Sequence, residues 1–105
     1  MDYRRKHRVP LMTEITYQCD GVGIAKRVSD ISEDGVFIDT SVPSAVGTEI
    51  AMSFDVGGRS IEVYGRVVHS QPFIGMGVQF VSLPADVRDL IEEFVEQAAM
   101  AAVNG

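Results

Sequence analysis

Much of the chain alternates apolar and polar residues with a period of two, which is typical of β-strands that bury one face. The clearest run spans 11–19, and its inward face would comprise Leu11, Thr13, Ile15, Tyr17 and Cys19. Runs of the same kind predict further strands at 22–30, 36–38, 50–56, 61–67 and 74–80. Six short strands with this spacing hide their apolar faces most simply by closing into a small antiparallel barrel.

The period changes from two to 3.6 residues after Pro84. Apolar residues then recur at helical spacing from Val87 to Ala98, which predicts one amphipathic helix over about 84–102. The glycine pair Gly57-Gly58 predicts a two-residue hairpin, because both positions of such a turn take positive φ angles. The expected fold class is therefore dominated by β-structure: a six-stranded antiparallel β-barrel with one C-terminal α-helix.

The composition is that of a single globular domain. Of 105 residues, 46% are hydrophobic and 23% are charged, which argues against disorder, and no apolar run is long enough to cross a bilayer. Cys19 is the single cysteine, so the sequence excludes an internal disulfide and a cysteine-based metal cluster. We expect Cys19 to be a half-buried strand residue and the protein to be cytoplasmic.

Charge is distributed unevenly along the chain. Residues 1–10 carry four cations and one anion, a net charge of +3, whereas residues 11–105 carry five cations and fourteen anions, a net charge of −9. The total of −6 argues against general binding to DNA or RNA, which depends on neutralising many phosphates. We expect a flexible basic arm at 1–9, followed by the barrel and its helix at 10–105.

The sequence contains no recognisable catalytic motif. Neither His7 nor His69 is accompanied by a serine or cysteine in a nucleophile motif. Phosphate-binding loops, metal-ligand spacings and the dinucleotide-binding glycine motif are also missing from the sequence. We therefore expect no enzymatic activity, no catalytic residue, no metal and no cofactor.

The basic arm contains a first candidate binding motif. Arg4 and Arg8 are four residues apart, with Arg5 between them. An arginine fork can bind a phosphate, or the O6 and N7 acceptors of guanine. Taken alone, the same residues are equally consistent with a solubilising tail.

A second candidate motif follows the second predicted strand. Asp30 and Ser32 are two residues apart, so they point the same way if strand geometry continues to that position. A carboxylate accepts hydrogen bonds from the N1–H and N2–H₂ donors of guanine, and a hydroxyl adds another. Gly35 would supply a turn that a ligand can approach closely. The alternative is an ordinary turn, since these residue types favour turns for local reasons.

Taken together, the motifs resemble those of the PilZ domain family. R-x-x-x-R stands directly before the first predicted strand, and D-x-S-x-x-G follows the second. The segment Gly75–Phe80, GMGVQF, is similar to the G-x-G-V-x-F strand of that family. The resemblance covers essentially the whole chain and implies a six-stranded split barrel that binds cyclic di-GMP across its outer face.

The resemblance also implies contacts to cyclic di-GMP from Arg4, Arg5, Arg8, Asp30, Ser32 and Gly35. The arginines would contact guanine and phosphate, the aspartate and serine would bond to the guanine edge, and the glycine would keep the turn open. Two further candidates are Gly77 and His69, the latter near the end of the fifth strand, where some family members place a tryptophan.

PilZ domains usually act by relay, so the resemblance implies a receptor whose arginine arm becomes ordered on binding and signals to a separate protein. That partner would belong to motility, pilus, exopolysaccharide or chemotaxis machinery. A rival interpretation is a PilZ-like adaptor that binds a protein without nucleotide, although such adaptors tend to lack these motifs. An RNA-binding barrel is disfavoured by the acidic body, and we expect neither nucleic-acid binding nor membrane insertion.

Overall fold

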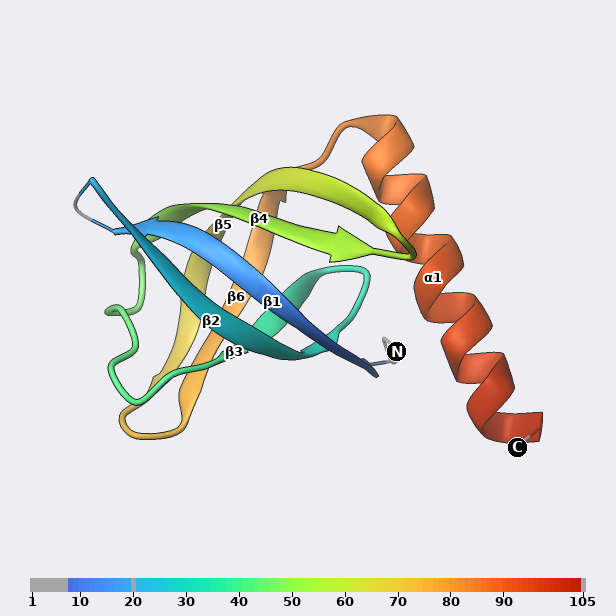
Figure 1. Cartoon of the computed structure of the whole chain (residues 1–105), viewed down its shortest axis with the longest axis horizontal. Helices are drawn as coiled ribbons and strands as arrows, with labels where there is room; N and C mark the ends of the chain where they lie inside the picture. The colour runs from blue at the N-terminus through green and yellow to red at the C-terminus, as the bar shows by residue number, and fades with distance from the viewer. Residues whose placement is uncertain (1–7, 20, 105) are drawn as a thin grey trace, which may run out of the picture.

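The computed structural model describes residues 8–19 and 21–104, which form six strands and a helix (Figure 1). The elements are, in chain order, β1 (Val9–Cys19), β2 (Val22–Ile31), β3 (Gly35–Asp39), β4 (Glu49–Val56), β5 (Arg59–Gln71), β6 (Gly75–Ser82) and α1 (Ala85–Asn104). The strands pair in the order β1-β2-β3-β6-β5-β4 to form a closed barrel, and each of these pairs is antiparallel. The predicted fold class is confirmed.

The alternating apolar residues fill the inside of the barrel. In β4 the buried positions are Ile50, Met52, Phe54 and Val56, and the residues between them are exposed or half-buried. Each such side chain stabilises the fold by about 1.5–3 kcal/mol relative to full exposure, so a slip of one residue in register would be costly. The Gly57-Gly58 hairpin joins β4 to β5, with φ angles of 56° and 83° as predicted.

Helix α1 crosses one end of the barrel and contacts β1 and β4 (Figure 1). Its buried residues, Val87, Ile91 and Val95, belong to the apolar face predicted from the sequence. An ion pair of 2.9 Å between Arg59 and Asp86 connects the first turn of the helix to the start of β5. No helix in the described part of the chain is long and apolar enough to span a membrane.

The β5–β6 hairpin is longer than predicted. The predicted strand ends at 67, but β5 continues to Gln71. The polar end of β5 shows no apolar alternation, yet its backbone pairs with residues 75–77 of β6. Ile74, expected in the last strand, consequently lies in the turn and is 58% exposed.

The barrel begins immediately after Arg8. Val9 is the first residue of β1 and is buried in the core. A bulge between Pro10 and Thr13 then interrupts the pairing of β1 with β2. Residues 1–7 of the expected basic arm lie outside the described residues.

Candidate functional site

Arg8, Asp30 and Ser32 meet where β1 begins and β2 ends. Because Val9 pairs with Ile31, Arg8 lies beside Ser32 on the neighbouring strand. The Arg8 guanidinium donates from Nε to Oδ1 of Asp30 at 2.8 Å, and its Nη2 lies 2.6 Å from the same oxygen. Its Nη1 lies 3.4 Å from Oγ of Ser32. One guanidinium therefore reaches both polar side chains, which face the same way as their spacing predicts.

The ion pair between Arg8 and Asp30 is only partly shielded from water. The two side chains are 49% and 35% exposed. A pair of this kind typically contributes between 0 and about 1 kcal/mol. A ligand with its own anionic and hydrogen-bonding groups can therefore replace this ion pair with little energetic penalty.

Ser32, unlike Arg8 and Asp30, is buried, with 1% of its surface exposed. Its amide donates to the carbonyl oxygen of Gly35 at 2.8 Å, which closes the turn between β2 and β3. Its Oγ accepts a hydrogen bond from the Asp34 amide at 3.2 Å. Ser32 therefore fixes the turn and at the same time offers its hydroxyl to Arg8.

Gly35 is required by the packing of two strands. A Cβ on Gly35 would lie 2.1 Å from the carbonyl oxygen of Val78, so β3 can approach β6 only without a side chain at this position. The φ angle of Gly35 is not in the left-handed region, and the turn itself does not demand glycine. The close contact with Val78 is thus a packing reason for glycine that the sequence did not indicate, and the contact of Gly35 with a ligand stays a prediction.

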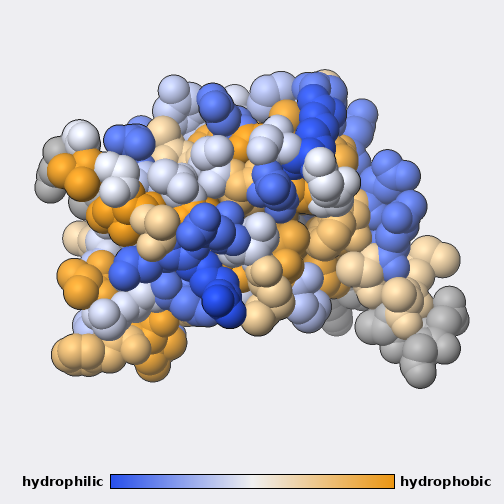
Figure 2. Space-filling view, viewed as in Figure 1, coloured by the Kyte–Doolittle hydropathy of each residue, from blue (hydrophilic) through white to orange (hydrophobic). Residues whose placement is uncertain are grey.

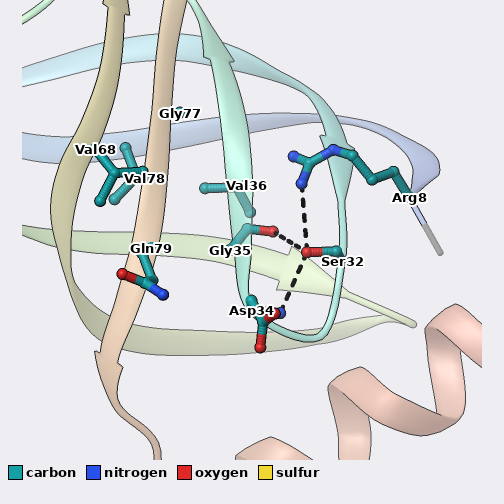
Figure 3. Close-up of a pocket in the computed structure, with 9 residues that line it drawn as sticks. All are labelled: Arg8, Ser32, Asp34, Gly35, Val36, Val68, Gly77, Val78 and Gln79. Atoms are coloured by element: carbon teal, nitrogen blue, oxygen red, sulfur yellow. Dashed lines mark hydrogen bonds between the residues drawn. The ribbon is translucent and has the colours of Figure 1, made fainter. Parts of the chain in front are cut away.

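An open cavity of about 310 Å³ lies beside this cluster. In Figure 3, Arg8 and Ser32 stand on one side of the cavity, and Val68, Val78 and Gln79 stand on the other, beyond β3. The complete lining is Arg8, Ser32, Asp34, Gly35, Val36, Val68, Gly77, Val78 and Gln79. Arg8 and Ser32 on one side, and valine side chains with the Gln79 amide on the other, suit a flat ring with hydrogen-bonding groups on its edge.

Gly77 contributes open surface to this cavity. A Cβ on Gly77 would lie 3.4 Å from Cβ of His69, which is an ordinary contact. At Gly75, by contrast, a Cβ would lie 2.4 Å from the carbonyl oxygen of Ile38. The fold therefore requires glycine at position 75 but tolerates a side chain at position 77.

A bulge in β5 decides which residue of that strand reaches the cavity. Val67 pairs with Val78 and His69 pairs with Gly77, so Val68 lies in the irregular step between them. Val68 is 49% exposed and lines the cavity. His69 lies beside Gly77 but is not among the lining residues.

The structure brings several of the predicted residues together. Of these, the cavity lining includes Arg8, Ser32, Gly35 and Gly77, and Asp30 joins them through its ion pair with Arg8. Arg4 and Arg5 lie outside the described residues. Sequence reasoning missed the lining residues Asp34, Val36, Val68, Val78 and Gln79. Most of them stand inside or beside the D-x-S-x-x-G and G-x-G-V-x-F motifs, which was an available signal.

The described residues do not form a metal site. Across 8–19 and 21–104, no group of three or more His, Cys, Asp or Glu side chains is arranged to hold a metal ion. The groups gathered at the cavity are hydrogen-bond donors and acceptors, one guanidinium and apolar surface. Such a set can recognise a polar, anionic ligand by shape and hydrogen bonding.

Solved structures share this fold at low sequence identity. The Bacillus subtilis inhibitor of motility MotI/DgrA superposes with a TM-score of 0.80 at 12% identity, over 96% of this chain and 53% of that one. The PilZ domain of Escherichia coli YcgR, solved with c-di-GMP, gives 0.71 at 14% identity, over 96% and 95% of the two chains. Borreliella burgdorferi PlzA, in complex with c-di-GMP, gives 0.70 at 15% identity, over 90% and 41%. This chain thus spans about half the length of MotI and less than half that of PlzA.

A comparison with family models agrees with the resemblance seen in the motifs. No curated protein sequence matches the chain closely enough to show a relationship. The family model for the PilZ domain, however, matches residues 2–97. That range includes the R-x-x-x-R motif, the D-x-S-x-x-G motif, all six strands and most of α1. The chain therefore belongs to the PilZ domain family.

Proposed function

We propose that this protein is a receptor that binds cyclic di-GMP without changing it chemically. The observation that carries the proposal is the cluster of Arg8, Asp30 and Ser32 beside the cavity, at the motif positions of a PilZ domain. Two structures with the same fold, those of YcgR and PlzA, contain this nucleotide.

The chemistry of the cluster matches that of the nucleotide. The Asp30 carboxylate can accept hydrogen bonds from the N1–H and N2–H₂ groups of guanine. The Arg8 guanidinium can donate to a phosphate, or to O6 and N7 of the base. Val68 and Gly77 offer an apolar and unobstructed surface to the face of the ring. Binding would exchange the ion pair between Arg8 and Asp30 for contacts to the ligand.

The size of the cavity limits how much of the nucleotide it encloses. A volume of about 310 Å³ lies at the small end of the range for ligand pockets, about 300–1,000 Å³, so we propose that it holds one guanine. The rest of the ligand would extend toward Arg8, where Arg4 and Arg5 are close in sequence. The finer part of the proposal is that residues 1–7 become ordered over the nucleotide and form a surface that a separate signalling protein recognises.

An NMR titration of amide chemical shifts with cyclic di-GMP tests where the nucleotide binds. We expect shifts at Gly35, Val68 and Gln79, and none at Ala51 and Tyr64, which line a separate cavity on the face formed by β1, β4 and β5. Saturable shifts that avoid the first three residues would contradict the proposed site. An unchanged spectrum at saturating nucleotide would favour an adaptor that works without a ligand.

A further inference from the structure

We infer that the end of the barrel far from α1 binds a protein partner by inserting an apolar protrusion into an uncharged, apolar pocket of that partner. This protrusion, which we call the apolar tip, consists of Val42, Phe73 and Ile74. These side chains are 79%, 85% and 58% exposed. In Figure 1 the β5–β6 turn that carries two of them lies at the opposite end of the barrel from α1, and hydrophobic surface gathers at that corner in Figure 2.

The apolar tip is held in place by backbone hydrogen bonds. The Phe73 amide donates to the carbonyl oxygen of Ser41 at 3.0 Å, and the Thr40 amide donates to that of Ile74 at 3.3 Å. Within the turn, the Ile74 amide donates to the carbonyl oxygen of Gln71 at 3.0 Å. The loop that carries Val42 and the β5–β6 turn are therefore joined by hydrogen bonds, which hold the apolar tip in a fixed position.

Phe73 has a backbone conformation that does not suit its side chain. Its φ angle is 69°, in the left-handed region that favours glycine or asparagine. It follows Pro72 and occupies the third position of a hydrogen-bonded turn, where a positive φ normally selects glycine. The residue thus combines backbone strain with an exposed aromatic ring, and neither stabilises the free fold. Strain of this kind, in a braced loop, points to a function for the side chain.

The chemistry of the tip defines the partner. Residues 40–48 and 70–80 contain no charged side chain, in a chain that is 23% charged. A projecting aromatic residue with aliphatic neighbours is typical of an anchor that fills a desolvated pocket on another protein. The complementary surface is therefore concave, apolar and uncharged.

Two other binding partners, a second copy of the chain and a lipid bilayer, suit the apolar tip less well. A second copy of the chain would have to accept Phe73 in a cavity, but the two cavities described above include charged residues, Arg8 and Asp34 in one and Glu62 in the other. An anionic bilayer would repel the body of the protein, since residues 11–105 carry a net charge of −9. The tip residues are not part of the nucleotide cavity, so this inference does not depend on cyclic di-GMP binding.

Thermal unfolding of the free protein tests whether Phe73 is retained at the expense of stability. Asparagine tolerates a positive φ and leaves no exposed ring, so Phe73→Asn should raise the Tm by about 4 °C. The matched control is Tyr64→Asn, because Tyr64 is also an exposed aromatic residue, at 67%, but lies within β5, where asparagine is unfavourable. The control should lower the Tm. A lower Tm for Phe73→Asn would show that the ring supports the fold, and would overturn the inference.

Binding by the tip is tested with a photo-crosslinking amino acid at position 42 of the full chain, in its native cells. The captured protein is then purified and titrated against three forms of the chain: the natural sequence, Phe73→Asn and Tyr64→Asn. We expect Phe73→Asn to weaken binding at least 30-fold and Tyr64→Asn to change it less than twofold. The inference would be overturned if Phe73→Asn and Tyr64→Asn weakened binding equally. It would also be overturned if no protein were captured, or if the captured protein were a second copy of the chain. Binding of the natural chain to phospholipid vesicles that Phe73→Asn abolishes would overturn it as well.

Discussion

At the scale of single residues, Arg8 links the fold to the proposed chemistry. It directly precedes the first core residue, Val9, and its guanidinium reaches both Asp30 and Ser32. Since β1 fixes its backbone and the ion pair positions its side chain, the charge is already near the cavity before any ligand arrives. Such preorganisation lowers the entropy lost on binding.

Replacing Arg8 with alanine should weaken cyclic di-GMP binding by about 10- to 100-fold, the equivalent of a lost charge-assisted contact of roughly 1–3 kcal/mol. Arg66→Ala is the matched control, because Arg66 also forms an exposed ion pair, of 2.7 Å with Glu49, but lies outside the cavity. Calorimetry should show less than a twofold change for the control. Equal losses would mean that the protein attracts the nucleotide by general charge.

The two glycines at the cavity should respond differently to alanine. Gly35→Ala places a Cβ 2.1 Å from the Val78 carbonyl oxygen, so we expect a loss of at least about 1–3 kcal/mol in the free energy of unfolding, measured with urea. Gly77→Ala meets only an ordinary contact of 3.4 Å with His69 and should leave the unfolding midpoint nearly unchanged. It should nevertheless weaken cyclic di-GMP binding, because the added methyl group covers surface that the base needs. Tight binding by a folded Gly77→Ala protein would remove Gly77 from the site.

At the scale of secondary-structure elements, the ion pair between Arg59 and Asp86 connects α1 to the hairpin between β4 and β5. The hydrogen bond from Arg59 is the main cause of a lowered pKa for Asp86, whose ordinary value is 3.8. The first turn of a helix also favours a negative charge. The two effects hold the start of α1 against the barrel when Asp86 is ionised.

This contact should depend on pH in a defined direction. Because the pKa of Asp86 is lower in the folded protein, its stabilising effect is present above about pH 4 and is lost as the pH falls through the lowered pKa. Arg59→Gln should raise the Asp86 pKa back toward 3.8, as followed by NMR of the side-chain carboxyl carbon. Arg66→Gln, which removes a different exposed ion pair, should leave the Asp86 titration unchanged.

The sequence predicted elements well wherever the apolar pattern itself stabilises them. The alternation in β4 and the apolar face of α1 directly reflect burial, and the glycine pair reflects the positive φ angles of its turn; all three predictions were confirmed. The extension of β5 to Gln71 was missed because backbone pairing with β6 sustains it without apolar side chains. Val68 was missed at the cavity because a bulge, set by the partner strand, turns it toward the cavity. The reason for Gly35 likewise depends on Val78, which is distant in sequence.

At the scale of the whole molecule, the barrel separates two surfaces. The β2–β3 turn, with Ser32, lies toward the end covered by α1, and the apolar tip lies at the opposite end of a molecule that measures 41 × 26 × 26 Å (Figure 1). The cavity extends from Ser32 along the β5–β6 hairpin to Val68 and Gly77, but it includes no residue of the apolar tip, so a small receptor could bind its ligand and its partner at the same time. The two proposals make separate predictions, so either can fail alone.

The central claim is that this PilZ domain binds cyclic di-GMP, and calorimetric titration of the full chain tests it most directly. We predict a single saturable isotherm with a Kd between tens of nanomolar and tens of micromolar, on the order of −7 to −10 kcal/mol. GMP and GTP should bind far more weakly, since each can fill only part of the site. Folded protein that gives no heat and no shift in Tm at saturating cyclic di-GMP would contradict the account.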